Sequence, residues 1–174
     1  YRYSGQCDIA VGTSIARRQQ KELEGLVGFF VNTLVLRDII NPASSFTEFL
    51  QQVKHSTLDA YQYQDIPFEK IVEKVVREKD YLRSPLFQVM LVLQNPPEAS
   101  KLQLGKVELS REPLSVDSSK FDFTFFLRET PEGLSGAVEY STDLFSSSTI
   151  TRLIIHFDQL LVSIVANPLE RVGD

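Results

Sequence analysis

The run VGFFVNTLVLR, residues 27–37, is the feature that most limits how this chain of 174 residues can fold. Its apolar residues do not alternate with polar ones, which is typical of a strand covered on both faces. Asn32 and Thr33 interrupt the run, and buried amide and hydroxyl groups need hydrogen-bond partners. The run therefore predicts a covered strand whose polar centre either bonds to neighbouring backbone or belongs to a functional site.

Two amphipathic helices are predicted after this strand. Ser45-Phe46-Thr47-Glu48 fits a capping box, and the apolar residues after it recur at helical spacing to about Gln62. Asp65 and Pro67 then mark the start of a second helix over 68–76. Proline suits the first helical position, and a carboxylate is favourable near the positive end of the helix dipole.

The remaining pattern alternates between strands and helices. Strands are predicted over 7–13, 86–94 after Pro85, 121–128 and 134–141, with a weaker one over 107–114 and a last helix from about 147 to 167. The strands over 121–128 and 134–141 are joined by a hairpin, so the sheet should be mixed. We expect an α/β (α+β) layered sandwich, a mixed sheet covered by helices, as one domain over 1–174 with no second domain.

Composition argues against several classes of function. Eighteen basic and 23 acidic residues give a net charge of −5, and the basic residues are scattered, so we expect no nucleic acid as a partner. No apolar segment approaches the roughly 20 residues of a membrane span, so we expect no membrane association. Cys7 is the single cysteine, and with no signal peptide this predicts a reducing, cytoplasmic location.

No catalytic constellation is visible in the residues. His55 and His156 lie on the polar faces of two different predicted helices. Two separated histidines make a poor metal site, since zinc needs three or four converging ligands. Cys7 has no histidine in an obvious pairing context, and no glycine-rich phosphate loop is present. We therefore predict neither a catalytic residue nor a metal site.

Five stretches stand in a fixed order along the chain: YSGQCDIAVGTSIARR (3–18), VGFFVNTLVLR (27–37), YQDIPFEKIVE (63–73), REKDYLRSPLFQVMLVLQN (77–95) and the run 120–157 that begins KFDFTFF. Together they resemble the condensation domains of nonribosomal peptide synthetases over nearly the whole chain. Three places depart from the family pattern. Tyr63 stands where His or Asn is usual, Glu78-Lys79 displaces part of the R-D-x-S-R-x-P-L-F motif, and Leu82 stands where Ser is commoner.

The resemblance implies a fold like that of chloramphenicol acetyltransferase, with two lobes around a tunnel. The tunnel admits the phosphopantetheine arms of a donor and an acceptor peptidyl carrier domain, and the family's reaction forms an amide bond between their substrates. The motif H-H-x-x-x-D-G, which carries the catalytic histidine, belongs to the first lobe, and this chain has no His-His pair. We therefore expect residues 1–174 to be part of a C-terminal lobe, inactive alone, that supplies tunnel wall, floor loop and carrier-docking surface. The implied partners are the N-terminal lobe, both carrier domains and an adjacent adenylation domain.

The resemblance also suggests roles for single residues. It places Gly12, Asn32 and Thr33 along the substrate tunnel. The other motif positions are expected to be structural: Gly28, Asp65, Pro67, Phe68, Glu69, Arg83 and Pro85.

Three of these positions have alternatives. Asn32 could be a satisfied buried residue, and Arg83 could either form a salt bridge or meet a phosphate. Residues 12–18 could be a mobile surface loop instead of a tunnel floor. For the function, the alternatives are a non-catalytic carrier-binding module, a fragment of a dual condensation/epimerisation domain, and an unrelated α/β domain.

Overall fold

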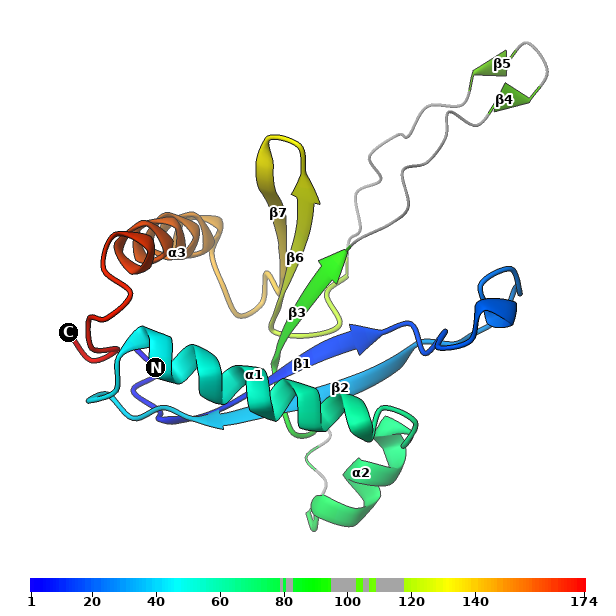
Figure 1. Ribbon diagram of the computed structural model, residues 1–174, viewed down its shortest axis with the longest axis horizontal. Coiled ribbons are helices and arrows are strands. Elements are labelled where there is room, and N and C mark those ends of the chain that lie inside the picture. The colour runs from blue at the N-terminus through cyan, green and yellow to red at the C-terminus, as the bar shows by residue number, and fades with distance from the viewer. Residues whose placement is uncertain (79, 81–82, 95–102, 105–106, 109–117) are drawn as a thin grey trace.

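The computed structural model of the protein describes residues 1–78, 80, 83–94, 103–104, 107–108 and 118–174, and Figure 1 shows their arrangement. Within these residues seven strands are formed: β1 (Asp8–Ile15), β2 (Asn32–Ile39), β3 (Val89–Gln94), β4 (Gln103–Leu104), β5 (Val107–Glu108), β6 (Phe123–Thr130) and β7 (Gly133–Tyr140). The helices are η1 (Lys21–Leu23), α1 (Phe46–Gln62), α2 (Phe68–Val75) and α3 (Ser147–Ala166). The weaker strand expected over 107–114 is seen as β5 alone, and residues 109–114 lie outside the described part.

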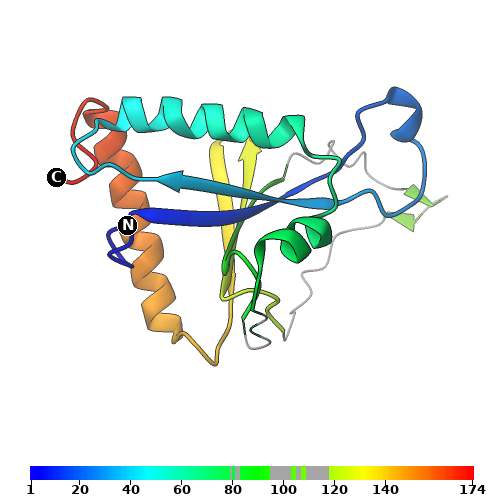
Figure 2. The ribbon, with the colours of Figure 1, turned by 90° about the horizontal axis from the view of Figure 1, so that it is seen from below.

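Five of the strands form one mixed sheet in the order β2-β1-β3-β6-β7, and β4 pairs with β5 separately. β1 runs antiparallel to β2 and parallel to β3, β3 runs parallel to β6, and β6 runs antiparallel to β7. The predicted hairpin and the predicted mixed sheet are therefore confirmed. Figure 2 shows the strong twist of this sheet, because β6 and β7 run across the direction of β1 and β2.

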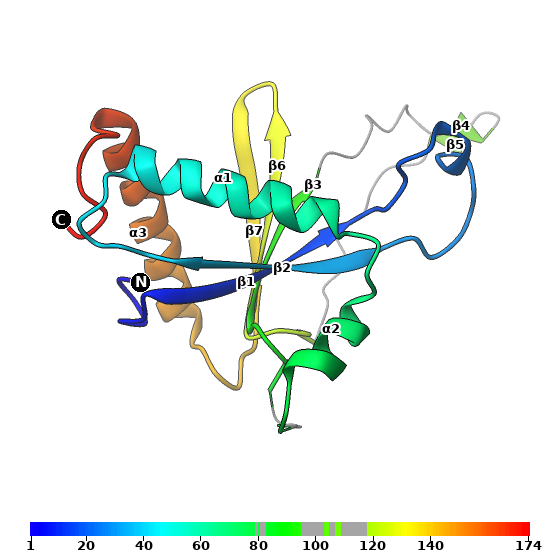
Figure 3. The same ribbon diagram turned by 60° about the horizontal axis from the view of Figure 1, so that its bottom comes forward.

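Two helices pack along different parts of the sheet, as Figure 3 shows. α1 lies beside β2, where Asp38 accepts hydrogen bonds from Gln52 and Ser56 at 3.1 and 2.9 Å. α3 lies beside β6, and the rings of Phe125 and Phe157 are 5.5 Å apart. The predicted layered sandwich of a mixed sheet with covering helices is thus confirmed.

The helix starts follow the sequence signals. Ser45 and Glu48 form the predicted capping box, in which the Ser45 hydroxyl accepts from the Glu48 N–H and the Glu48 carboxylate accepts from the Ser45 N–H. Pro67 is the N-cap of α2, and Glu69 lies in its first turn. α3 begins after Ser146, whose hydroxyl accepts from the N–H of Thr149.

The expectation for the run 27–37 was wrong in two respects. Residues 27–31 do not belong to a strand, and β2 is buried on one face alone, at Asn32 and Leu34, whereas Thr33 and Val35 of the other face are half-buried. Val27 and Phe29 are 105% and 93% exposed. The apolar composition of the run predicts burial by other residues of this chain. In the structure, residues 27–31 form exposed surface instead.

Large apolar side chains are exposed on several elements of the described part of the chain. Leu26 and Leu58 are 52% and 49% exposed, and Val162 and Val165 of α3 are 70% and 82% exposed. Much of the apolar surface is therefore available for contact with further protein.

The ends of β1 and β2 are joined by an exposed ion pair. Arg37 Nε and Nη2 donate to the two carboxylate oxygens of Asp8 at 2.8 and 2.7 Å. These hydrogen bonds, together with the positive charge of Arg37, hold the pKa of Asp8 below its ordinary value of 3.8. Because the folded-state pKa is the lower one, the pair stabilises the fold above that ordinary value and loses this effect as the pH falls through the lowered pKa.

Replacing Asp8 by Asn should therefore reduce stability slightly at pH 7 and not at all at the lowest pH. Urea unfolding of both proteins between pH 7 and pH 2.5 measures the difference. Glu48, whose pKa is lowered by the capping box, is present in both proteins, so its titration cancels. Salt should shrink the difference at pH 7, because exposed charges are screened. A difference in the free energy of unfolding that grows towards acid pH would contradict the lowered pKa of Asp8.

Candidate functional site

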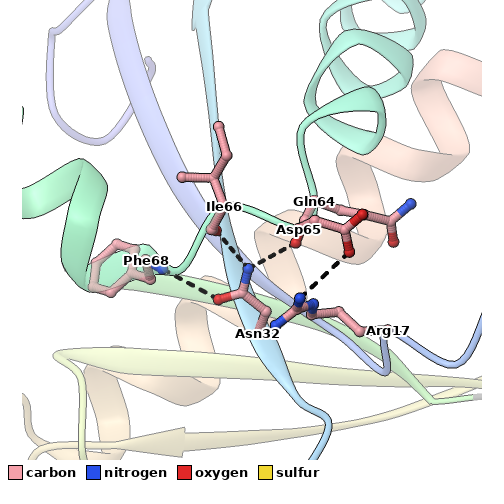
Figure 4. A network of polar contacts seen from close by, with 6 residues as sticks. All are labelled: Arg17, Asn32, Gln64, Asp65, Ile66 and Phe68. Carbon is pink, nitrogen blue, oxygen red and sulfur yellow. Dashed lines mark hydrogen bonds and ion pairs between the residues drawn. The ribbon is translucent and has the colours of Figure 1, made fainter.

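The amide of Asn32 holds the connection between α1 and α2, as Figure 4 shows. Asn32 stands at the start of β2 and is 8% exposed. Its Nδ2 donates to the carbonyl oxygens of Gln64 and Ile66, both at 2.8 Å, and its Oδ1 accepts from the N–H of Phe68 at 3.2 Å. One side chain thus satisfies three backbone groups and fixes the start of α2 against the sheet.

These contacts match the structural alternative for Asn32. Both of its amide hydrogens are used, so a ligand could reach only the second lone pair of Oδ1. Thr33 is half-buried and lies opposite Ser14 in the β1–β2 register. A contact of either residue with a substrate tunnel stays a prediction.

Asp65 pairs across the chain instead of capping α2. Its carboxylate lies 3.4 Å from Nη2 of Arg17, and its side chain is 73% exposed. The N–H of Phe68 at the start of α2 is met by Asn32, which comes from a strand far away in sequence. Asn32 Nδ2 donates to the carbonyl oxygens of the residues on either side of Asp65. Asn32 therefore also positions the Asp65 carboxylate that faces Arg17.

Gly12 lies within β1 and not in a loop after it, which corrects the expectation of a surface loop from residue 12. It is paired with Val35 of β2 and Met90 of β3. A Cβ atom at this position would stand 2.2 Å from the ring of Phe87. Phe87 is 1% exposed, and Gly12 leaves the room that its ring occupies.

Phe87 connects the sheet to the start of α2. Its ring centroid lies 5.7 Å from that of Phe68 and 5.2 Å from that of Phe121. Such spacing is typical of packed aromatic pairs. The aromatic cluster was not predicted, although a glycine within a strand is a known sign of close approach by another group.

The connection between β1 and β2 begins at residue 16 and folds back on itself. The guanidinium of Arg18 lies 4.2 Å from the centre of the Phe30 ring and donates to the carbonyl oxygens of Leu23 and Glu24. A Cβ at Gly28 would approach the same Phe30 ring to 2.9 Å. Arg18 thus contacts the second half of the connection, and both alternatives for residues 12–18, a tunnel floor and a mobile surface loop, stay predictions.

Arg83 and Pro85 lie at a second place on the surface. Both are exposed, and Arg83 Nε is 4.0 Å from Oδ2 of Asp80, a weak ion pair. They line a cavity of about 480 Å³ whose apolar walls include Val72, Val76 and Leu86. The salt bridge, one of the two alternatives for Arg83, is thus present as a weak pair, a phosphate contact stays a prediction, and Leu82 of the same motif lies outside the described residues.

The two histidines do not line the cavity beside Arg83. His55 bonds to the carbonyl of Gln51 on its own helix, and His156 bonds to the hydroxyl of Tyr3 at 2.7 Å. Both histidines and Cys7 are exposed. Among the residues that the structure describes, no group of three or more His, Cys, Asp or Glu could hold a metal ion.

α3 is long and apolar enough to cross a membrane by length and composition, with a mean hydropathy of 1.4. The expectation that no apolar segment approaches this length was wrong by this measure, because the 20 residues of α3 are apolar on average although they include Arg152 and Asp158. One such helix is weak support for a membrane span. The contact of Phe157 with Phe125 is that of a helix packed on a sheet.

Solved structures define the class of fold. A four-domain nonribosomal peptide synthetase, holo-AB3403 bound to AMP and glycine, matches 98% of this chain with 14% of its own at a TM-score of 0.90 and 24% identity. The X-domain from teicoplanin biosynthesis matches 99% of this chain with 40% of its own, at a TM-score of 0.88 and 28% identity. The fold is therefore that of condensation-type domains.

The chain belongs to the Condensation domain family, whose sequence profile matches residues 1–174. A linear gramicidin synthase of Brevibacillus parabrevis is 48% identical over 172 residues, which are 97% of this chain and 3% of that protein. Tyrocidine synthase 3 of the same organism is 42% identical over 177 residues, or 99% of this chain and 3% of that protein. The resemblance seen in the sequence motifs is thus confirmed, and the chain spans a small part of these relatives.

Proposed function

We propose that residues 1–174 are part of the C-terminal lobe of a nonribosomal peptide synthetase condensation domain. The intact domain joins a carrier-tethered donor acyl or peptidyl thioester to the amine of a carrier-tethered aminoacyl acceptor. The observation that carries this proposal is the family match over the whole chain, together with relatives named as gramicidin and tyrocidine synthases.

The assignment as a lobe rests on how much of the fold is uncovered. The chain matches 40% of a solved condensation domain from the Monacolin K polyketide synthase MokA, at a TM-score of 0.84 and 19% identity. Large apolar side chains on several described elements are exposed, among them Val162 and Val165 of α3. The exposed apolar residues Leu26, Val27, Phe29 and Val31 offer a surface that the other lobe could cover.

In the proposed reaction the acceptor amine attacks the donor thioester carbon. The C–N bond forms, the C–S bond breaks, and the donor carrier's thiol leaves while the amine loses a proton. By family resemblance, the histidine that acts on the amine belongs to the N-terminal lobe. Residues of this chain position the substrates: Asn32 fixes the start of α2, and Gly12 and Phe87 fix the sheet beside it.

The substrates arrive on phosphopantetheine arms that belong to partner carrier domains. Such an arm carries a phosphate, two amides and short apolar stretches. The exposed guanidinium of Arg83 beside an apolar cavity fits a phosphate of this kind, because arginine donates to phosphate oxygens with a planar fork of N–H groups. We further expect an adjacent adenylation domain as a partner and a cytoplasmic location.

The proposal is tested by assaying amide formation with loaded donor and acceptor carriers. The intact synthetase module should form the amide, residues 1–174 alone should not, and adding the remainder of the condensation domain should restore turnover. If residues 1–174 alone formed the amide, the proposal that the catalytic histidine belongs to the N-terminal lobe would be wrong.

Two other outcomes identify the alternatives. Carrier binding without amide formation by the intact module would favour a binding module. An epimerised donor in the product would indicate a dual condensation/epimerisation domain.

A further inference from the structure

We propose that Arg18 is a positioning residue, which holds the β1–β2 connection (residues 16–31) in the shape that the other lobe of the condensation domain packs against; this rests on the proposed function. Figure 1 shows the connection projecting beyond the ends of β1 and β2. Arg18 stands near the start of the connection and is half-buried. Its side chain contacts three residues that follow later in the same connection.

The guanidinium of Arg18 joins the two halves of the connection. Its Nη1 donates to the carbonyl oxygens of Leu23 and Glu24, at the end of η1. Its central carbon lies 4.2 Å from the centre of the Phe30 ring, which is the arrangement of a cation–π contact. The planar guanidinium can donate and stack at the same time. One side chain therefore ties η1 to the segment that leads into β2.

The Phe30 ring in turn determines which side of the segment faces outward. A Cβ atom at Gly28 would stand 2.9 Å from this ring, so a glycine leaves the ring its room. Phe30 is half-buried, whereas the neighbouring Phe29 is 93% exposed. Holding Phe30 beside Arg18 therefore leaves Phe29 on the outer side of the connection.

The outer side forms an apolar face made by Leu26, Val27, Phe29 and Val31, whose exposed fractions range from 50% to 105%. No charged residue lies between Gly25 and Leu36 in the sequence. Permanent protein contacts are more hydrophobic than transient ones. The apolar face therefore favours a partner that is always present over a carrier domain, which must bind and leave.

The remainder of the same domain is such a partner. This chain corresponds to 40% of the solved X-domain from teicoplanin biosynthesis, so most of a domain of that kind lies outside residues 1–174. In the proposed function the other lobe carries the catalytic histidine. A small displacement of reacting groups lowers the rate strongly. A surface that is already in shape also loses less conformational entropy on contact than a loose loop does.

The test uses the intact synthetase module, with one loaded carrier supplied as a separate domain so that KM can be measured. Arg18→Met keeps an apolar stem beside Phe30 and removes the charge and the donors. Lys21→Met is the matched control, because it removes the same charge from an exposed position of the same connection. Phe29→Ala removes the largest side chain of the apolar face. Hydrogen exchange of residues 26–31 reports the shape of the connection.

We expect Arg18→Met to lower kcat per folded molecule about tenfold, with KM for the donor and the acceptor carrier changed less than about twofold. Exchange of the amides of residues 26–31 should become about tenfold faster. The melting temperature should match that of Lys21→Met, which should leave kcat and exchange unchanged. Arg18→Lys keeps a charge near Phe30 but lacks the planar fork, so its kcat should be intermediate.

A double variant separates positioning from a local loss of stability. Phe29→Ala alone should also lower kcat about tenfold, the usual size of an effect at an important interface residue. Combining it with Arg18→Met should lower kcat little further, because Arg18 acts through the face to which Phe29 belongs. A combined loss of about 100-fold, the product of the single effects, would show that the two residues act independently and would overturn the inference.

Three further results would overturn the inference. The first is an equal kcat for Arg18→Met and Lys21→Met. The second is a Phe29→Ala module whose KM for a carrier rises while kcat is unchanged, since a carrier domain would then cover the apolar face. The third is a dimeric module that Phe29→Ala makes monomeric, since a second copy would then cover it. In each case amide formation by the unaltered module leaves the proposed function standing, whereas its failure to form any amide would overturn that function.

Discussion

Replacing Gly12 by alanine should lower the free energy of unfolding by about 3 kcal/mol, the upper end of the usual cost of overpacking a core. The new methyl group would stand 2.2 Å from the Phe87 ring. The ring cannot easily move, because Phe68 and Phe121 pack against it and Phe87 is 1% exposed. β1 or β3 would therefore have to shift, and urea unfolding of the intact condensation domain measures the cost.

Two further variants separate the clash from a general intolerance of alanine. Gly25 has nothing within 4 Å of its Cβ position, so Gly25→Ala should stay within about 0.5 kcal/mol of the unaltered protein. Combining Gly12→Ala with Phe87→Leu should cost less than the sum of the two single changes, since the smaller side chain leaves space for the methyl group. Strict additivity would show that Gly12 and Phe87 do not compete for the same space.

Replacing Asn32 by leucine should cost about 3 kcal/mol or more, since three backbone groups lose their partner and each unsatisfied buried group costs about 1–3 kcal/mol. These groups are the carbonyls of Gln64 and Ile66 and the N–H of Phe68. The matched control is Asn41→Leu. Asn41 makes one exposed hydrogen bond, to the N–H of Ala43, so its loss should cost far less.

The same variant decides between the two interpretations of Asn32. If Asn32 only holds the α1–α2 connection, the rate of amide formation per folded molecule should fall no further than in a variant of equal stability, for which Ile150→Ala in the buried part of α3 serves. A rate loss at least tenfold greater than in that variant would show that Asn32 also contacts the tethered substrate. Rates and folded fractions are measured on the same intact module at a temperature below both melting points.

Elements with local signals could be predicted from the sequence. The capping box at Ser45 sets the start of α1, and the turn between β6 and β7 sets the hairpin, because both depend on residues within a few positions of each other. The mixed sheet followed from that hairpin. The motif resemblance identified the family, since it depends on the order of short segments and not on their contacts.

Contacts between distant segments could not be predicted. Gly12 and Phe87 fit together only once β1 and β3 are neighbours, and neither residue alone marks the other. The pairing of Arg17 with Asp65 depends likewise on Asn32 drawing the α1–α2 connection to β2. The prediction of a covered strand over 27–37 was wrong for a related reason. Apolar composition indicates that a surface is covered by other protein, but it does not indicate which part of the protein covers it.

The order of the five strands has a consequence for how the chain folds. β6 and β7 are joined by a short turn, and β1 and β2 pair across one connection, so each pair can form early from nearby residues. β3 bridges these pairs, and it is parallel to both neighbours, to β1 through Gly12 and Met90. Bringing it between them closes a long loop, so we expect its insertion to be the slowest step of assembly. Until then, each half-sheet presents an unpaired edge to other nascent chains, as strand edges do.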